Sequence, residues 1–336
     1  MPQAIAEKPE GSSSRRFMEF FRKEERPSVS SFIEAHVKEA RKMRLGVNQY
    51  AGEMRINIEE DFGFKSKREI YVKQYLSLVG TIAGILEGEG ITGYDKLSKE
   101  GKKQMQKDFI EGVWGVIYGN MHMSYGNSRF GLLSKSLDKN LWDCDNSATL
   151  VYDVARELGI PVKMIVVPSH ALVTTEDFCF ETTVKKFASY YPVGKLREYY
   201  PRVYAETSDK EVIDAIAWAS RAGIEDHDRA IYYYTMSLQR NPNDADVYIN
   251  RADAHIWKGR LGKSYMRGEG YRAAIDDLTK AIELNPDFIA ARSERGKLYL
   301  SQGELDKALE DFLTAAWMAA RKAYNFMKER FERIAR

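Results

Sequence analysis

The feature that most constrains this chain is a repeated pattern of small and apolar residues in its C-terminal third. The stretches at 228–242 and 274–286 carry such residues at matching offsets, and each ends in an Asn-Pro pair. A second apolar-periodic stretch follows each of them, at 245–259 and 290–316. Spacings of three and four residues are typical of amphipathic helices. The pattern therefore predicts helix pairs stacked in an array.

The repeated pattern resembles the tetratricopeptide repeat, a helix-turn-helix unit of about 34 residues. Pro242 and Pro286 lie 44 residues apart, which exceeds that period by 10 residues. We expect the excess, the glycine-rich and basic RLGKSYMRGEG at 260–270, to form a loop between two helices. The resemblance implies a repeat module with a C-terminal capping helix over 210–336, which binds a peptide or protein partner.

The inner helix positions of the repeats argue against one kind of partner. In the version of the family that binds chaperone C-terminal tails, lysine, asparagine and arginine side chains clamp a carboxylate. Only Asn250 fits such a place, since Asp246, Asp253 and Glu294 are acidic. The sequence therefore does not favour binding of chaperone tails.

Composition excludes several classes of function. The net charge of +2 comes from interspersed acids and bases, without the basic stripe of a nucleic-acid binder. No apolar run reaches the roughly 18 residues of a membrane span. The first residues have no apolar core of a secretory signal, and residues 1–16 read as a disordered tail. Together with only two cysteines, this favours a cytoplasmic location.

Residues 141–185 predict a helix followed by three strands. The apolar spacing over 145–158 is helical, Gly159 suits the left-handed residue that ends a helix, and Pro161 prevents its continuation. VKMIVV at 162–167 is rich in β-formers, and HALVTT and FCFETT flank Glu176 and Asp177 as a hairpin. Residues 17–120 read as a helical layer without assignable chemistry.

Cys144 is the candidate for chemistry in this region, with four possible roles. A buried apolar thiol and a disulfide with Cys179 remain alternatives to a nucleophile. A structural metal site is not expected, because the chain lacks C-x-x-C and H-x-x-x-H spacings. A helix N-terminus lowers a thiol pKa, which favours a nucleophile at Cys144. The adjacent Asp143 and Asp145 oppose a thiolate.

The predicted hairpin supplies a base and an acid for this thiol. If Thr174 and Asp177 flank the turn, His170 lies directly opposite Glu181 on one face of the sheet. Opposed side chains have Cβ atoms about 5 Å apart, so a hydrogen bond between the imidazole and the carboxylate is expected. Such a pair can accept a thiol proton and stabilise the resulting charge.

The motif D-C-x-x-x-A-x-x-x-x-x-x-A-R-x-L-G-I-P-V, then P-S-H-A, then F-x-F-E-T-T, resembles the transglutaminase-like superfamily of Cys-His-acid enzymes in the papain-like group. The resemblance implies an α+β domain over 17–205, with a helical part at 17–120 and a catalytic core at 110–190, ahead of the all-α repeats. It assigns Cys144 as nucleophile, His170 as base and Glu181 as the third member. The family usually has Asp where this chain has Glu181.

The family's oxyanion side chain has no unique match here. The candidates are Trp114, Tyr118, Asn120 and Trp142. The sequence thus predicts a cysteine-dependent acyl-transfer enzyme for peptides or proteins, without metal or cofactor, whose reaction is hydrolysis, deamidation or transamidation. The alternative is a catalytically inactive scaffold with the same fold that acts in protein-protein interaction.

Overall fold

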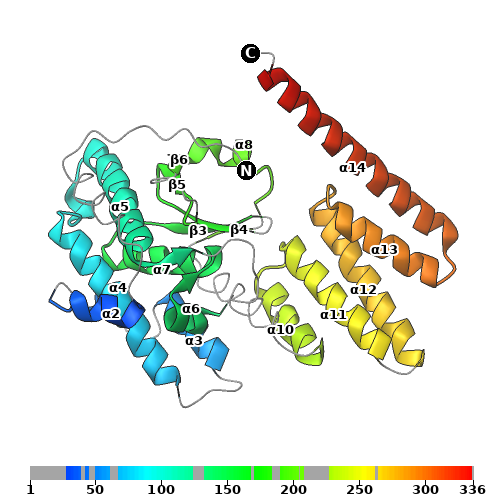
Figure 1. Cartoon of the computed structure of the whole chain (residues 1–336), viewed down its shortest axis with the longest axis horizontal. Helices are drawn as coiled ribbons and strands as arrows, with labels where there is room; N and C mark the ends of the chain where they lie inside the picture. Colours follow the sequence, from blue (N-terminus) through cyan, green and yellow to red (C-terminus); the bar gives the residue numbers. More distant parts are fainter. Residues whose placement is uncertain are drawn as a thin grey trace. The chain divides into compact units, whose positions relative to one another are not determined.

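The structure, a computed structural model, describes residues 28–38, 42–44, 50–60, 67–123, 132–167, 170–183, 190–203, 205–207, 227–261 and 264–334. The chain divides into two compact units, Met1–Ile224 and Glu225–Arg336 (Figure 1). The predicted tail at 1–16 and the first residues of the predicted repeat module, 210–226, lie outside the described residues. The described part is mostly helical with a small sheet in the first unit, as the α+β prediction expected at this level. A transglutaminase-like fold for this unit stays a prediction.

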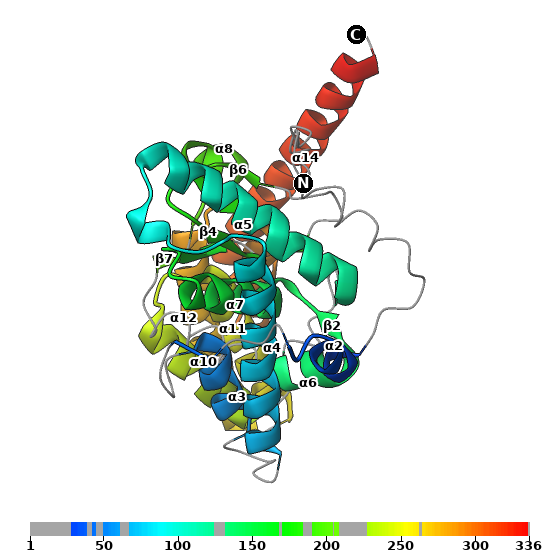
Figure 2. The ribbon, with the colours of Figure 1, turned by 90° about the vertical axis from the view of Figure 1, so that its left-hand side faces the viewer.

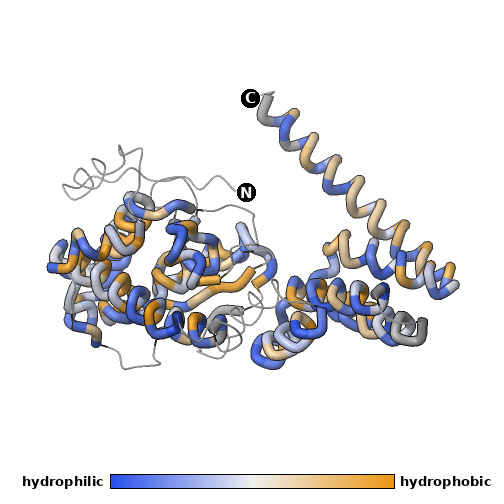
Figure 3. Tube along the Cα trace, turned by 60° about the horizontal axis from the view of Figure 1, so that its bottom comes forward, coloured by the Kyte–Doolittle hydropathy of each residue, from blue (hydrophilic) through white to orange (hydrophobic). Residues whose placement is uncertain are grey.

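The main sheet of the N-terminal unit has five antiparallel strands in the order β6-β5-β4-β3-β7. The predicted strands are β3, β4 and β5, while β6 and β7, which flank them, were not predicted. Two further short strands, β1 and β2, pair in parallel. The strands are β1 His122–Met123, β2 Leu141–Trp142, β3 Lys163–Val167, β4 His170–Thr174, β5 Phe178–Phe180, β6 Tyr190–Pro192 and β7 Ala205–Thr207. Figure 3 shows apolar residues concentrated in the strands of this unit.

Helix α7 packs on strands β3 and β4, and helices α3 and α4 pack against α7 (Figure 2). The helical layer expected over 17–120 is therefore present among the described residues. The helices of this unit are α2 Val29–Ala35, α3 Ala51–Glu60, α4 Arg68–Gly88, α5 Lys99–Asn120, α6 Leu133–Lys139, α7 Cys144–Glu157 and α8 Leu196–Tyr199, with 3₁₀ turns at Tyr94–Lys96 and Val193–Lys195.

Both ends of α7 follow from its sequence. The carboxylate of Asp143 accepts the Asn146 N–H at 2.9 Å, which caps the first turn. Gly159 takes a left-handed φ of 75° after the last turn, and the Ile160 N–H returns to the Ala155 carbonyl at 2.9 Å. The predicted helix stop at Gly159 is confirmed, and Cys144 is the first residue of the helix.

Buried carboxylates on α7 hold the N-terminal segments in place. Asp153 accepts the backbone N–H groups of Ala51 and Gly52, each at 2.8 Å, and the Tyr75 hydroxyl at 2.7 Å. It thereby caps α3 from a helix about 100 residues away in sequence. Burial still raises the pKa of Asp153 to about 6. Glu157 accepts the Tyr50 hydroxyl at 2.8 Å.

Glu59 caps a second helix in the same manner. Its carboxylate accepts the backbone N–H groups of Leu133 at 2.5 Å and Ser134 at 2.9 Å, the first two residues of α6. The carboxylate is buried, and this burial raises its pKa despite these donors and the nearby Arg55. The free backbone N–H groups at the starts of α3 and α6 thus donate to carboxylates that lie far away in the sequence.

The C-terminal unit consists of antiparallel helices, as the repeat pattern predicts. They are α10 His227–Arg240, α11 Ala245–Leu261, α12 Ser264–Leu284, α13 Ile289–Ser301 and α14 Leu305–Ile334. Each packs against the next along the chain (Figure 1). The Arg251 guanidinium donates to both oxygens of Asp277 and to the Thr235 hydroxyl, so one side chain joins three successive helices. Arg295 repeats this arrangement with Asp311 and Thr279.

The expected loop at 260–270 is wrong. Helix α11 continues to Leu261 and α12 already begins at Ser264, so most of the excess residues lengthen the two helices. One glycine of the predicted loop, Gly270, serves a close approach instead. A Cβ on Gly270 would lie 2.8 Å from the His255 carbonyl oxygen and 3.2 Å from the Gly259 Cα. These two helices can pack at this distance only because glycine has no side chain.

Candidate functional site

Cys144 lies where the N-terminus of α7 meets strand β4. It is a free thiol, and its sulfur has a hydrogen bond with the backbone of Ala171, which follows His170 directly. The packing of α7 on β4 thus brings Cys144 to the residue that directly follows the predicted base in the strand. Cys144 and His170 lie 26 residues apart in the sequence, and the two segments meet because α7 packs on β4.

His170 and Glu181 form the predicted pair. The Nε2 atom of His170 lies 2.7 Å from the Glu181 carboxylate, and both side chains are largely buried. The contact is confirmed, but the proposed register is wrong. Val173 pairs with Phe180 and Thr174 with Cys179, which places Leu172 opposite Glu181. The shift is two residues, so Glu181 stays on the face of His170 and reaches it diagonally.

Two tyrosines that the sequence reasoning missed hold Glu181. The hydroxyl of Tyr200 donates to Glu181 Oε1 at 2.9 Å, and that of Tyr191 donates to the same oxygen at 3.2 Å. Burial and the Glu181 charge raise the pKa of both phenols, so they remain donors. The Tyr200 ring also stacks on His170 with centroids 6.1 Å apart. Both oxygens of Glu181 are therefore engaged, one by the imidazole and one by the phenols.

The electrostatic surroundings keep Cys144 protonated. Burial raises the pKa of the Cys144 thiol well above its ordinary value, and the charges of Asp145 and Asp143 raise it further. The sulfur lies 3.5 Å from Asp145 Oδ1, at which the thiol points as a donor. Burial and Asp145 also raise the pKa of Asp143 to about 7. The helix N-terminus is therefore outweighed by burial and two carboxylates, and the resting sulfur is a thiol.

We expect Asp145→Asn to make Cys144 more reactive. The substitution removes the charge that most raises the thiol pKa after burial. The midpoint of the pH-rate profile for iodoacetamide alkylation should move to lower pH, with alkylation at pH 7.5 faster by about threefold or more. Asp95→Asn, an exposed acid that does not act on Cys144, is the matched control. An unchanged profile in Asp145→Asn would show that this carboxylate does not control the thiol.

Two candidates for the oxyanion donor are already engaged. Trp142 is fully buried, and its indole N–H donates to Asn140 Oδ1 at 3.2 Å. The Asn120 amide donates to the Val116 carbonyl of its own helix at 2.8 Å. The Tyr118 side chain lies outside the described residues. Trp114 is buried in α5 and stays a candidate without support.

Cys179 does not take part in the site as a disulfide partner. Both cysteines are free, and Cys179 is fully buried on β5. It packs in an apolar cluster with Ile165, Leu172 and Tyr191.

Within the described residues, no three His, Cys, Asp or Glu side chains gather in a way that could hold a metal ion. Of the helices that the structure describes, none combines the length and apolar character needed to cross a membrane.

The geometry of the C-terminal unit defines a helical-repeat protein module, and comparison with known proteins gives its class. Residues 260–325 match the family model described as tetratricopeptide repeat. The C-terminal unit therefore contains tetratricopeptide repeats, and this class of repeat supports the expectation of a protein partner.

Curated relatives match about a quarter of the chain. DnaJ homolog subfamily C member 3 of Bos taurus is 40% identical over 83 residues, 25% of this chain and 14% of the relative. Hsp70-Hsp90 organizing protein 3 of Arabidopsis thaliana is 32% identical over 83 residues, 25% of this chain and 13% of the relative. Serine/threonine-protein phosphatase 5 of Homo sapiens is 32% identical over 90 residues, 27% and 16% of the two chains. The chain thus spans about a seventh of the length of these relatives.

Two solved structures also match parts of the chain. The second tetratricopeptide domain of Spaghetti (RPAP3), bound to the HSP90 peptide SRMEEVD, is 28% identical in sequence. The match has a TM-score of 0.26 and covers 31% of this chain and 91% of that one. A crystal structure of MamA is 15% identical in sequence, with a TM-score of 0.29, and the match covers 68% of this chain and 98% of that one.

Proposed function

We propose that the N-terminal unit is a cysteine-dependent acyl-transfer enzyme with a transglutaminase-like fold over 17–205, which acts on a peptide or protein amide. The observation that carries the proposal is the 2.7 Å hydrogen bond between His170 and Glu181, on the strand that packs against the helix of Cys144. The predicted order of thiol helix, histidine strand and acid strand supports the same assignment.

In this proposal, Glu181 sets the orientation of the imidazole. It binds Nε2 of His170, which leaves Nδ1 as the ring atom able to accept the thiol proton. Tyr191 and Tyr200 fix the carboxylate that stabilises the imidazolium formed by this transfer. Because Cys144 rests as a thiol, the proton moves to His170 as the sulfur attacks, rather than before substrate arrives.

The covalent steps follow the chemistry of thiol acyl transfer. The sulfur of Cys144 bonds to the amide carbonyl carbon, and the carbonyl oxygen takes up the electron pair. Collapse of this intermediate breaks the C–N bond, and His170 returns its proton to the leaving amine. Water or a second amine then attacks the thioester, with His170 as base, and frees the thiol. Hydrolysis, deamidation and transamidation differ only in the leaving group and in this last nucleophile.

The repeat module has its own role in the proposal. A tetratricopeptide stack binds an extended segment or helix of a partner, so we assign it the recruitment of a substrate or partner protein. Burial raises the pKa of Asp253 on α11, and the Glu294 charge on α13 raises it further, which indicates two acids close together in the stack. A cytoplasmic location stays a prediction.

The test is alkylation by iodoacetamide at neutral pH, followed by peptide mapping. We expect Cys144 to be labelled faster than the buried Cys179, and His170→Ala to slow the labelling of Cys144 by about tenfold or more. Cys179→Ala should leave the labelling of Cys144 unchanged, and circular dichroism checks that each variant folds. His170 can take the thiol proton while the sulfur attacks iodoacetamide, as it does with a substrate in this proposal. Unlabelled Cys144, or labelling that does not depend on His170, would therefore contradict the enzyme.

The second candidate is a catalytically inactive scaffold. It is favoured by one observation, the raised pKa of the Cys144 thiol beside two carboxylates. If labelling fails while Cys144→Ala leaves stability and partner binding unchanged, the scaffold is the better description of the N-terminal unit.

A further inference from the structure

The last helix, α14, has an apolar stripe that the described residues of the C-terminal unit leave exposed. Its members are Leu313, Trp317, Ala320, Tyr324, Met327 and Phe331. Successive members are separated alternately by four and three residues, the heptad spacing that positions a and d have in a coiled coil. The five large side chains of this heptad stripe are between 52% and 71% exposed.

The heptad stripe is separate from the face that α14 uses inside its own unit. Ala308, Asp311 and Ala315 are buried on that inner face. From Arg321 to Glu332, every described side chain of α14 is exposed, and Figure 1 shows the helix continuing past the end of α13. A short isolated helix is marginal in water, so this length of exposed amphipathic helix is suited to packing against a partner.

The positive charges on the two sides of the heptad stripe indicate which kind of partner can bind to it. The flanking positions carry Arg321, Lys328 and Arg330, and the other flanking positions, Thr314, Ala316 and Ala323, are uncharged. A second copy of α14 would bring its own cations to the same seam with no acid to pair with them, and like charges at these positions oppose association. An acidic partner pairs with them instead.

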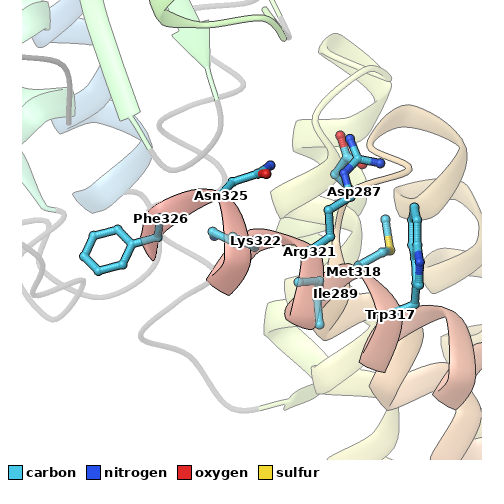
Figure 4. Close-up of a pocket in the computed structure, with 8 residues that line it drawn as sticks. All are labelled: Asp287, Ile289, Trp317, Met318, Arg321, Lys322, Asn325 and Phe326. Atoms are coloured by element: carbon cyan, nitrogen blue, oxygen red, sulfur yellow. The ribbon is translucent and has the colours of Figure 1, made fainter. Parts of the chain in front are cut away.

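A pocket adjoins the heptad stripe at Trp317. It has a volume of about 420 Å³ and lies between the start of α13, at Asp287 and Ile289, and the side of α14 (Figure 4). Arg321 lies over the Trp317 ring, 5.3 Å from its centroid, and extends toward Asp287 in Figure 4. An aromatic and cationic hollow is thus available at the point where the exposed stripe meets the repeat stack.

We propose that the heptad stripe docks an amphipathic helix of another protein, with apolar residues at heptad spacing and acidic residues at the flanks. The spacing supplies the apolar match, the three flanking cations supply the charge match, and Trp317 anchors the end next to the pocket. This surface differs from the inner helix faces of the repeats, so one module can hold two partners.

The probe is a synthetic, fluorescently labelled peptide of about four heptads, with Leu at positions a and d and Glu at the flanks, which repel one another and keep the peptide monomeric. Binding to the full chain is followed by fluorescence anisotropy. A second peptide with Lys at the flanks should bind at least about tenfold more weakly. Sedimentation should show that the free protein is a monomer.

Two matched pairs of variants test the stripe. Phe331→Ser should weaken binding of the acidic peptide by about tenfold, whereas Leu300→Ser, an exposed apolar residue of α13 outside both the stripe and the pocket, should not. Lys328→Glu should weaken binding by about threefold and improve binding of the Lys peptide, whereas Lys73→Glu, at an exposed site on α4 and with the same change in net charge, should do neither. These side chains are exposed, so the fold should tolerate each change.

Three outcomes would overturn the proposal. Equal binding of the two peptides would remove the charge match. A dimer that Phe331→Ser dissolves would make a second copy the occupant. A lower unfolding temperature of Phe331→Ser than of Leu300→Ser, without any peptide, would show that this protein's own chain covers the stripe.

Discussion

Replacement of Asp153 by alanine should destabilise the N-terminal unit by about 3 to 5 kcal/mol, the largest single effect that we expect in this unit. Asp153 is fully buried, and the substitution leaves the Ala51 and Gly52 N–H groups and the Tyr75 hydroxyl without their acceptor. Because domains are stable by only about 5 to 15 kcal/mol, such a loss would bring the unit close to unfolding. Urea denaturation followed by circular dichroism measures it.

A double-mutant cycle with Tyr75→Phe separates this network from general packing. Tyr75→Phe removes one donor and should cost less than Asp153→Ala, and the two effects should not add, because both act on one hydrogen bond. Asp95→Ala, at an exposed acid, should change stability by less than about 0.5 kcal/mol. A loss below about 1 kcal/mol in Asp153→Ala would contradict the assigned role.

Arg295→Ala should have the second largest effect, a loss of about 3 kcal/mol in the C-terminal unit. The substitution breaks two hydrogen bonds of 2.8 Å to Asp311 and one of 2.9 Å to Thr279, and it leaves a buried carboxylate at Asp311. Arg292, 3.8 Å from Asp311, compensates only in part. Hydrogen exchange of the amides in α12 to α14 localises the loss.

Two further substitutions give the Arg295 prediction its controls. Arg295→Lys keeps the charge but cannot form the two-pronged contact, so we expect an intermediate loss. Lys297→Ala breaks an exposed ion pair with Glu294 and should cost no more than about 0.5 kcal/mol. Equal losses for Arg295→Ala and Lys297→Ala would mean that the Arg–Asp–Thr contact does not hold the helices together.

Local signals were sufficient for the elements around the candidate site. Asp143, Gly159 and Pro161 mark the limits of α7, and alternation along the hairpin places His170 and Glu181 on one face. An error of two residues in the register left this face unchanged, because side chains on a strand repeat every second residue.

Contacts between distant segments were beyond such reasoning. Tyr191 and Tyr200 meet Glu181 through strand β6 and the turn after it, and no local spacing links them to a carboxylate on β5. Asp153 and Glu157 look like the solvent face of an amphipathic helix, since charged residues are seldom buried without a partner and the partners lie about 100 residues earlier. Gly270 was assigned to a loop because its role, close contact of two backbones, exists only in the fold.

The carboxylates that cap distant helices set a lower limit on how far this protein can be trimmed. A chain that started at residue 110 would keep Cys144, His170 and Glu181. It would lose the backbone amides and hydroxyl groups at 50–75 that donate hydrogen bonds to the buried carboxylates of Asp153 and Glu157. Buried anions deprived of donors would then draw in water beneath α7. The smallest fragment that keeps this network must therefore begin ahead of Arg44, whose backbone N–H donates to Glu157.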